Sequence, residues 1–267
     1  MIWQNANAQQ TVGAWKDEKS LYAETKQVNQ FFRRFNNEEA VDGTRYYNKK
    51  DSLFRDVKNR PKYLKMVFDN ENPSISKEIK NSFIADVTNK KKPQYLDFHG
   101  GKWFAQVKTT FLFKGKEEPL TMYLTLQDAK VGTKWVISSI QFKEYRKEYI
   151  KDTSDSKYFL HPLSHEVDFM NLHKIFEHNA TNIFEYTAQG YQPDQLTLFI
   201  EDVRKHHLKF VTVKNVKLHF FQIDGWYFEL SEFNRSGNNT GWLISAITKA
   251  NDKEKVQMEQ FIKNTHD

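Results

Sequence analysis

The sequence predicts an α+β protein built from two tandem copies of one small domain, in which helices precede a three-stranded antiparallel meander. Two observations predict this class. In each half of the chain, apolar residues at helical spacing give way to the alternation that is typical of strands. Three short segments also recur in the same order about a hundred residues apart, and such ordered recurrence indicates a duplication.

The recurring segments agree in residue type and spacing. Residues 134–140 read Lys-Trp-Val-Ile-Ser-Ser-Ile and residues 241–247 read Gly-Trp-Leu-Ile-Ser-Ala-Ile, so that Trp, Ile, Ser and Ile coincide. The other matches are 104–108 with 210–214, and 83–87 with 199–203. We therefore expect a first repeat over 18–150 and a second over 151–267 that ends in a helix, while 1–17 are expected to be disordered or a signal-peptide remnant.

In the first repeat, three apolar stripes at helical spacing precede three alternating segments joined by short turns, and strands joined in this way are antiparallel. Ser74 is expected to cap the third helix, and Pro93 to end it. The predicted elements are helices over 20–39, 61–68 and 74–89 and strands over 103–113, 120–126 and 135–142.

The second repeat has the same order of elements. A charged stretch over 143–157 is predicted to be a linker or a solvated strand extension. Asp224-Gly225 is a hairpin signal between two of the strands. The predicted elements are helices over 164–178, 182–187 and 194–206, strands over 209–222, 226–233 and 242–248, and a closing helix over 251–264.

The composition excludes several kinds of chemistry. The chain contains no cysteine, which excludes disulfides, thiol nucleophiles, thiolate zinc sites and iron–sulfur clusters. It has no P-loop, no dinucleotide fingerprint and no Gly-x-Ser-x-Gly motif, so no cofactor is expected. No stretch reaches the roughly 18 consecutive apolar residues of a membrane-spanning helix.

Charge is divided unevenly along the chain. Residues 1–150 carry 27 Lys and Arg against 18 Asp and Glu, a net +9, whereas residues 151–267 carry 13 against 16, a net −3. A basic half suits an anionic partner or is simply a solvated surface. Because the charges are scattered and no RNA-recognition or zinc-finger motif accompanies them, nucleic acid is disfavoured as a partner.

The N-terminal residues contain a possible export signal. Ala6-Asn7-Ala8 has the A-x-A pattern that signal peptidase cleaves, although a basic and an apolar segment should precede it. Two interpretations stay open: export, with a mature protein that begins near Gln9 and a start codon upstream of Met1, or a frayed terminus on a cytoplasmic protein.

Helices before a curved antiparallel meander, whose last strand carries Trp135 or Trp242 followed by alternating Ile and Val, resemble the nuclear transport factor 2-like (cystatin-like) α+β cone. The chain is similar in particular to uncharacterised exported proteins of Bacteroides-type bacteria, through Phe-Met-Asn-Leu at 169–172 and Gly-Trp-Leu-Ile-Ser at 241–245. This resemblance implies a periplasmic or surface location and no known activity.

Cone enzymes place an acid or a histidine on inward-facing strand positions as the general base. The predicted strands of the first repeat contain no Asp, Glu or His, and those of the second contain three such residues, among them His219 and Glu229. Glu229 alternates with the apolar residues of its strand and should point away from the face that they bury. His206 and His207 are expected to diverge at a helix end, where the macrodipole favours them, so no metal site is predicted.

Five aromatic residues are candidates for binding a small ligand at the mouths of the sheets, although tryptophans that fill the core are the simpler interpretation. Two of them, Tyr123 and Tyr227, lie on the opposite pleat from the buried residues of their strands, on a face that is exposed or meets the other repeat. The five candidates are Trp103, Tyr123, Trp135, Tyr227 and Trp242.

These observations favour a non-enzymatic binding or interaction module that is exported to the periplasm or cell envelope. Its partner would be a protein, a glycan or a small apolar ligand. The alternative is a cone-fold enzyme of the isomerase, cyclase or dehydratase type that acts on a small apolar carbonyl compound.

Overall fold

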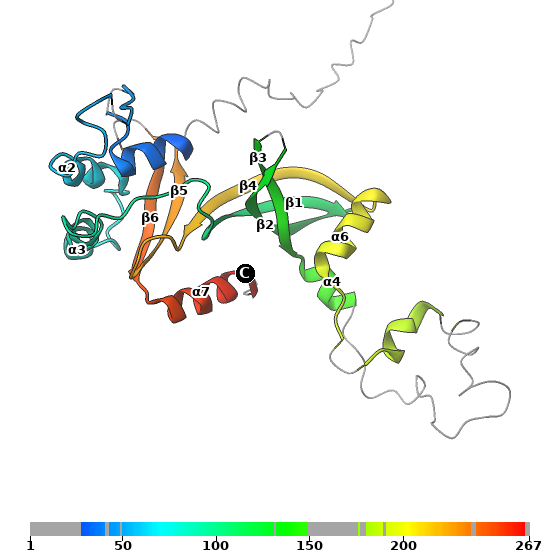
Figure 1. The fold of residues 1–267 in the computed structure, drawn as a ribbon. Coiled ribbons are helices and arrows are strands. Elements are labelled where there is room, and N and C mark those ends of the chain that lie inside the picture. Colours follow the sequence, from blue (N-terminus) through cyan, green and yellow to red (C-terminus); the bar gives the residue numbers. More distant parts are fainter. Residues whose placement is uncertain are drawn as a thin grey trace, which may run out of the picture. The chain divides into compact units, whose positions relative to one another are not determined.

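The computed structural model describes residues 28–40, 43–48, 50–130, 132–148, 176, 180–188, 191–235 and 239–264 (Figure 1). The chain divides into two compact units. Unit 1 comprises Met1–Lys102 and His219–Asp252, and unit 2 comprises Trp103–Leu218 and Lys253–Asp267. Each unit is therefore assembled from two separate stretches of the sequence.

The strands form a single six-stranded antiparallel sheet in the order β3-β2-β1-β4-β5-β6. The α+β class with antiparallel strands is thus confirmed. A second tandem copy is not evident in the described part of the chain, because the strands of both predicted repeats belong to one sheet. The strands are β1 Trp103–Phe113, β2 Lys116–Ala129, β3 Gly132–Gln141, β4 Leu208–Phe220, β5 Trp226–Phe233 and β6 Gly241–Lys249.

The described helices lie close to the predicted ones, with two differences. Residues Lys143–Glu148 form the helix α4 where a linker or strand extension is predicted, because the buried ring of Tyr145 anchors this turn to a core. Helix α3 spans Lys77–Val87 and is capped by Ser76, whose hydroxyl accepts from the backbone N–H of Ile79 at 3.3 Å, so the assignment of the cap to Ser74 is wrong.

The remaining helices follow the predicted order, and the predicted helix over 164–178 lies outside the described residues. None of the described helices is long and apolar enough to cross a membrane. They are residues 28–36, α2 Arg60–Leu64, the 3-10 helices η1 Lys65–Val67 and η4 Ala180–Tyr186, α6 Gln195–Arg204 and α7 Asp252–Asn264.

The core of unit 1 is a cluster of aromatic rings between the helices and β5. Phe83 of α3 lies edge-on to Trp226, with ring centroids 5.3 Å apart, and to Phe228 at 5.7 Å. Phe35, from the helix over 28–36, stacks on Phe228 at 6.2 Å, and Phe220 of β4 stacks on the same ring at 4.9 Å. Burying a phenylalanine side chain contributes about 1.5–3 kcal/mol, so each buried ring of this cluster stabilises the unit by about that amount.

A buried arginine links the elements of unit 1. The guanidinium of Arg60, whose residue is 1% exposed, donates to the carbonyl oxygens of Phe35 at 3.0 Å, Val87 at 2.9 Å and Gln94. Its charge also lies over the ring of Tyr95, 4.3 Å from the centroid. Burial lowers the pKa of Arg60 to about 10, so the side chain still carries its charge at neutral pH.

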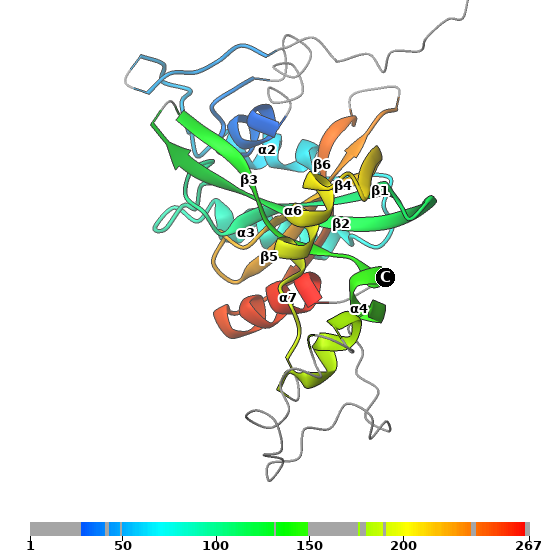
Figure 2. The same ribbon diagram turned by 90° about the vertical axis from the view of Figure 1, so that its right-hand side faces the viewer.

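Unit 2 has its own core on β1, β2, β3 and α6, which lies against β3 (Figure 2). Phe199 of α6 meets Phe111 of β1 edge-on, with ring centroids 5.7 Å apart. Tyr145 of α4 packs edge-on against Phe142 in the same core, with ring centroids 4.9 Å apart. The buried members are Phe111, Phe113, Leu120, Ile140, Phe142, Tyr145, Phe199 and Leu208.

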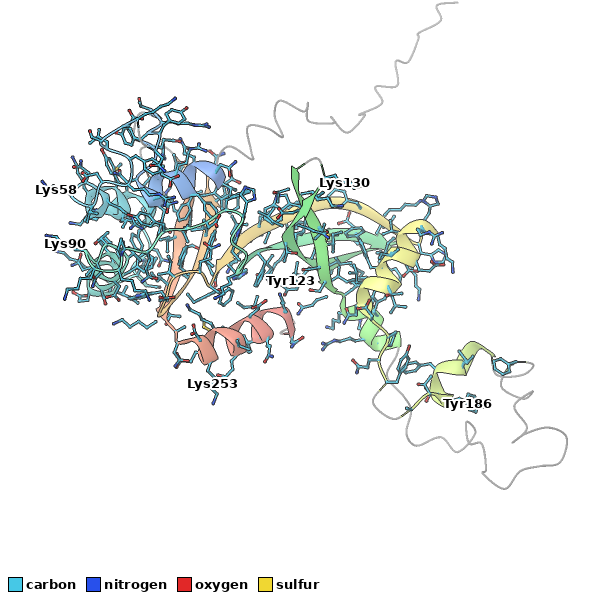
Figure 3. The ribbon with its side chains drawn as sticks, in the orientation of Figure 1. Lys58, Lys90, Tyr123, Lys130, Tyr186 and Lys253 are labelled. Carbon is cyan, nitrogen blue, oxygen red and sulfur yellow. The ribbon has the colours of Figure 1, made fainter. Side chains whose placement is uncertain are left out.

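The other face of β2 is covered by α7. The hydroxyl of Tyr123, on the side of the strand that faces α7 (Figure 3), donates to the carbonyl oxygen of Ile262 at 2.6 Å. Gln141 donates to the carbonyl oxygen of Lys263. These two side chains satisfy carbonyls that the end of any helix leaves without a partner, so they fix the C-terminal turn of α7 on the sheet.

Candidate functional site

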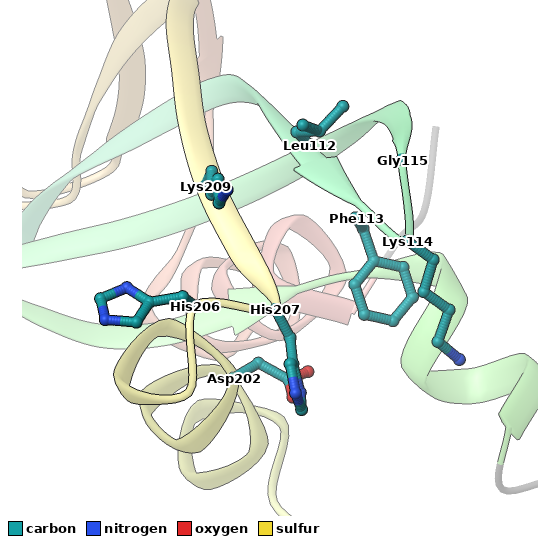
Figure 4. Close-up of a pocket in the computed structure, with 8 residues that line it drawn as sticks. All are labelled: Leu112, Phe113, Lys114, Gly115, Asp202, His206, His207 and Lys209. Atoms are coloured by element: carbon teal, nitrogen blue, oxygen red, sulfur yellow. The ribbon is translucent and has the colours of Figure 1, made fainter.

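The candidate site is a cavity of about 660 Å³ in unit 2, where α6 ends and β4 begins (Figure 4). One wall is the turn between β1 and β2, with Leu112, Phe113, Lys114 and Gly115. The other wall comes from the α6–β4 junction. Its residues are Asp202, His206, His207 and Lys209.

The end of α6 determines where the two histidines lie. The backbone N–H of His207 donates to the carbonyl oxygen of Asp202 at 2.9 Å, and that of His206 donates to Val203 at 3.1 Å. This pair of bonds is the Schellman motif, which needs a left-handed residue just after the helix. His206 takes that position with a φ of 61°, so the chain turns sharply and the two imidazoles point in different directions (Figure 4).

Asp202 holds His207 in place. His207 Nδ1 lies 3.1 Å from Asp202 Oδ1, and the hydroxyl of Tyr145 donates to Asp202 Oδ2 at 2.8 Å. Both carboxylate oxygens are thus engaged. The side chain of His207 is 59% exposed, whereas Tyr145 is 2% exposed, so a buried phenol supports a carboxylate that presents an imidazole to solvent.

The opposite wall is a tight hairpin. Phe113 pairs with Lys116, and the two residues between them, Lys114 and Gly115, have φ values of 49° and 81°. Positive φ at both central positions is typical of a type I′ turn, which brings the strands back at the correct twist. The ammonium of Lys114 lies 4.9 Å from the centroid of the Phe113 ring. The turn therefore adds both an apolar surface and a cation to the cavity.

The His and Asp side chains described at this cavity are not placed so that they could hold a metal ion together. Among the described residues, no three His, Asp or Glu side chains gather closely enough to hold a metal ion. The predicted divergence of His206 and His207 is borne out by their orientations (Figure 4).

The five predicted aromatic residues lie elsewhere. In unit 2, Trp103 is buried and meets Trp135 edge-on at 5.3 Å, while Trp135 is 39% exposed. Tyr123 is buried under α7, a helix of the predicted second repeat. In unit 1, Tyr227 is buried and Trp242 is half-buried. None of the five lines the cavity at the end of α6.

Unit 1 contains a second polar cluster on β4 and β5. The hydroxyl of Tyr227 donates to Glu229 Oε1 at 3.0 Å, and its oxygen lies 2.7 Å from His219 Nδ1. Because the single phenolic proton goes to Glu229, Nδ1 of His219 carries the hydrogen of the second bond. Burial raises the pKa of Tyr227 well above its ordinary value and the charge of Glu229 adds to the shift, so the phenol stays neutral.

The sequence analysis named His206, His207, His219, Tyr227 and Glu229 but not Asp202 and Tyr145, the supporting residues of His207. Asp202 was visible only as part of the recurring segment 199–203, and Tyr145 stood inside the charged stretch taken for a linker. A signal did exist for Tyr145, since an aromatic residue within a charged run can mark the side of a short helix that packs on a core.

Comparison with protein-family models, with curated proteins and with solved structures finds no match to this chain.

Proposed function

We propose that this protein is a non-enzymatic binding module that works in the periplasm or cell envelope and engages an anionic partner. The observation that carries the proposal is the filling of both cores by aromatic side chains. Phe83, Phe228 and Trp226 occupy the space under the helices of unit 1, and Phe111 and Phe199 do so in unit 2. A cone enzyme needs an open interior at that place, so the outer surfaces are the better candidates for function.

Charge supports an anionic partner. The first 150 residues carry 27 Lys and Arg against 18 Asp and Glu. Binding through such exposed charges weakens with salt, because the Debye length is about 8 Å at physiological ionic strength and shortens further as salt rises. The experiment is capture of partners from a cell-envelope extract at low and high salt. We expect capture to be lost at high salt, and equal retention at both would contradict an electrostatic contact.

The location rests on the Ala6-Asn7-Ala8 pattern and on the resemblance to exported cone-like proteins. Sequencing the N-terminus of the native protein from fractionated cells tests it. A mature chain that begins near Gln9 is the expected result, and an intact Met1 in the cytosolic fraction would contradict export.

We also propose that the chain arose by duplication, with the helices exchanged between the two copies. The helix before the first meander, α3, packs through Phe83 on Trp226 and Phe228 of the second meander. The helix before the second meander, α6, packs through Phe199 on Phe111 of the first. Phe83 and Phe199 are the matching residues of the recurring helical segments, which supports an exchange of equivalent elements.

One observation favours the enzymatic alternative. The chain of His219, Tyr227 and Glu229 joins a base, a neutral phenol and a carboxylate, which are the groups of a carbonyl isomerase. Exchange of the α-protons of cyclohexanone in D₂O, followed by NMR, tests this alternative. The enzymatic alternative requires the protein to accelerate this exchange and Tyr227→Phe to abolish the acceleration. An exchange rate equal to that in buffer alone would exclude the alternative for this class of ketone.

A further inference from the structure

The cavity between the end of α6 and the β1–β2 turn has an unbalanced charge. Lys114 and Lys209 place two cations on its wall, and His206 and His207 add charge when they are protonated. Among the described lining residues the acid is Asp202, and its two oxygens are engaged by Tyr145 and His207. The wall therefore carries more positive than negative charge, which favours an anionic ligand.

The backbone conformation at His206 places its side chain at the cavity. Its φ of 61° lies in the left-handed region, where glycine is favoured because it lacks a Cβ. The chain keeps an imidazole on the cavity wall at a position where glycine would give a more stable helix end.

We propose that this cavity binds a small organic phosphomonoester. The phosphoryl group lies against the cationic wall, and an apolar body lies against Leu112 and Phe113. A phosphomonoester carries about −1.5 to −2 charges at neutral pH and has three acceptor oxygens, so it balances this wall better than a carboxylate does. This inference rests on the proposed function and names the ligand that one part of the module accepts.

The volume of the cavity and the hydrogen-bond donors on its wall suit a phosphomonoester. A cavity of about 660 Å³ is larger than a phosphoryl group requires and leaves room for an organic body. His207 meets Asp202 through Nδ1, so the imidazolium form of His207 would use its Nε2–H to donate to a phosphoryl oxygen. A hydrogen bond from a charged nitrogen to phosphate is stronger than one between neutral groups, so His207 and the two lysines are the residues that select the anion.

Isothermal titration calorimetry of the full chain with phenyl phosphate, inorganic phosphate and benzoate tests the ligand class. We expect phenyl phosphate to bind about tenfold more tightly than inorganic phosphate, because partial burial of a phenyl ring is worth about that factor. Benzoate should bind least. Equal affinity for all three, or no heat with phenyl phosphate, would overturn the proposal.

Substitutions test whether phenyl phosphate binds in this cavity. His207→Gln and Lys209→Gln should each weaken phenyl phosphate about tenfold, the effect of losing one charged hydrogen bond. Lys205→Gln is the matched control: it removes a cation from the same helix end, but Lys205 pairs with Glu201 at 3.0 Å and does not line the cavity. The affinity of the Lys205→Gln variant for phenyl phosphate should stay within about twofold of that of the unchanged protein. An equal loss in Lys205→Gln and His207→Gln, with circular dichroism unchanged in both, would overturn the site.

Vesicles distinguish a lipid headgroup from a free phosphomonoester. Sedimentation with vesicles of phosphatidic acid in phosphatidylcholine, reversed by phenyl phosphate, would assign a lipid source, whereas calorimetric binding without sedimentation would assign a free one. If phenyl phosphate fails to bind while the chain still retains a salt-sensitive partner, the ligand inference fails and the binding-module proposal stands.

Discussion

Tyr145 of α4 donates its hydroxyl proton to Asp202 of α6 at 2.8 Å, and the other oxygen of the same carboxylate lies 3.1 Å from Nδ1 of His207. Asp202 therefore joins a buried phenol to an exposed imidazole. The hydrogen bond from Tyr145 fixes the carboxylate, and the carboxylate in turn fixes the ring of His207. Supporting groups of this kind orient a ligand-binding histidine without touching the ligand.

Tyr145→Phe removes the hydroxyl and leaves the buried side of Asp202 without this donor. We expect the free energy of unfolding to fall by about 1–2 kcal/mol, the cost of an unsatisfied polar group, and the affinity for phenyl phosphate to fall as well. Urea denaturation and calorimetry measure the two effects. Tyr47→Phe is the control, because Tyr47 is 55% exposed. Similar losses in both variants would show that Tyr145 has no special role.

His206→Gly should stabilise the protein and weaken the site at the same time. Glycine adopts a left-handed φ without strain, which is worth about 1 kcal/mol at a helix C-terminus. Thermal and urea denaturation should therefore show a gain, while calorimetry shows weaker binding of phenyl phosphate. A loss of stability would contradict the assignment of strain to His206.

Asn37→Gly is the matched control for His206→Gly. Asn37 ends the helix over 28–36 with the same pair of backbone bonds, Asn37 to Arg34 at 3.1 Å and Glu38 to Arg33 at 2.7 Å, and has a φ of 58°. Its side chain also donates to the carbonyl oxygen of Leu53 at 2.9 Å. Glycine removes that bond, so this variant should show no gain in stability.

Arg60→Lys should destabilise unit 1 strongly. A lysine cannot reproduce the three bonds from Arg60 to the carbonyls of Phe35, Val87 and Gln94, and it leaves buried acceptors without a donor. We expect a loss of about 3 kcal/mol in the free energy of unfolding. Arg55→Lys, at a side chain that is 40% exposed, should cost less than about 1 kcal/mol. Equal losses in urea denaturation would contradict the account of Arg60.

Separate expression of residues 18–150 and 151–267 tests the exchange of helices. Each fragment lacks the strands on which its own helix packs, since Phe83 needs Trp226 and Phe199 needs Phe111. We expect neither fragment to unfold cooperatively alone, and the mixture to regain helical circular dichroism and a cooperative transition. A fragment that folds by itself would instead indicate two sequential domains.

Local patterns predicted the elements well and their packing poorly. The strands around Trp103 and Trp226 were predicted within a few residues, because alternation and turn residues are local signals. The joining of both meanders in one sheet, and the packing of Phe83 and Phe199 on distant strands, depend on contacts between residues far apart in sequence. Periodicity contains no information about such contacts. The cap of α3 was misplaced because Ser74 and Ser76 are equally good capping residues two positions apart.

The candidate site was hidden for a similar reason. Asp202 and His207 are five residues apart, which is not a spacing at which side chains meet on a helix. They meet because His206 turns the chain with a positive φ, and a histidine is a much weaker sequence signal for that conformation than a glycine. Alternation placed Tyr123 on a face that is exposed or meets the other repeat and could not decide between the two, because the helix that covers it, α7, lies more than a hundred residues later in the chain.

The most direct test of the account is long-range ¹H–¹⁵N NMR of the imidazole of His207 in the full chain, with and without phenyl phosphate. We predict a hydrogen on Nδ1, held by Asp202, and a change in the Nε2 resonance that saturates as phenyl phosphate is added. Asp202→Asn should alter the Nδ1 signal. A His207 spectrum that is unchanged by phenyl phosphate, while the ligand binds elsewhere in the protein, would contradict the assignment of this cavity as the site.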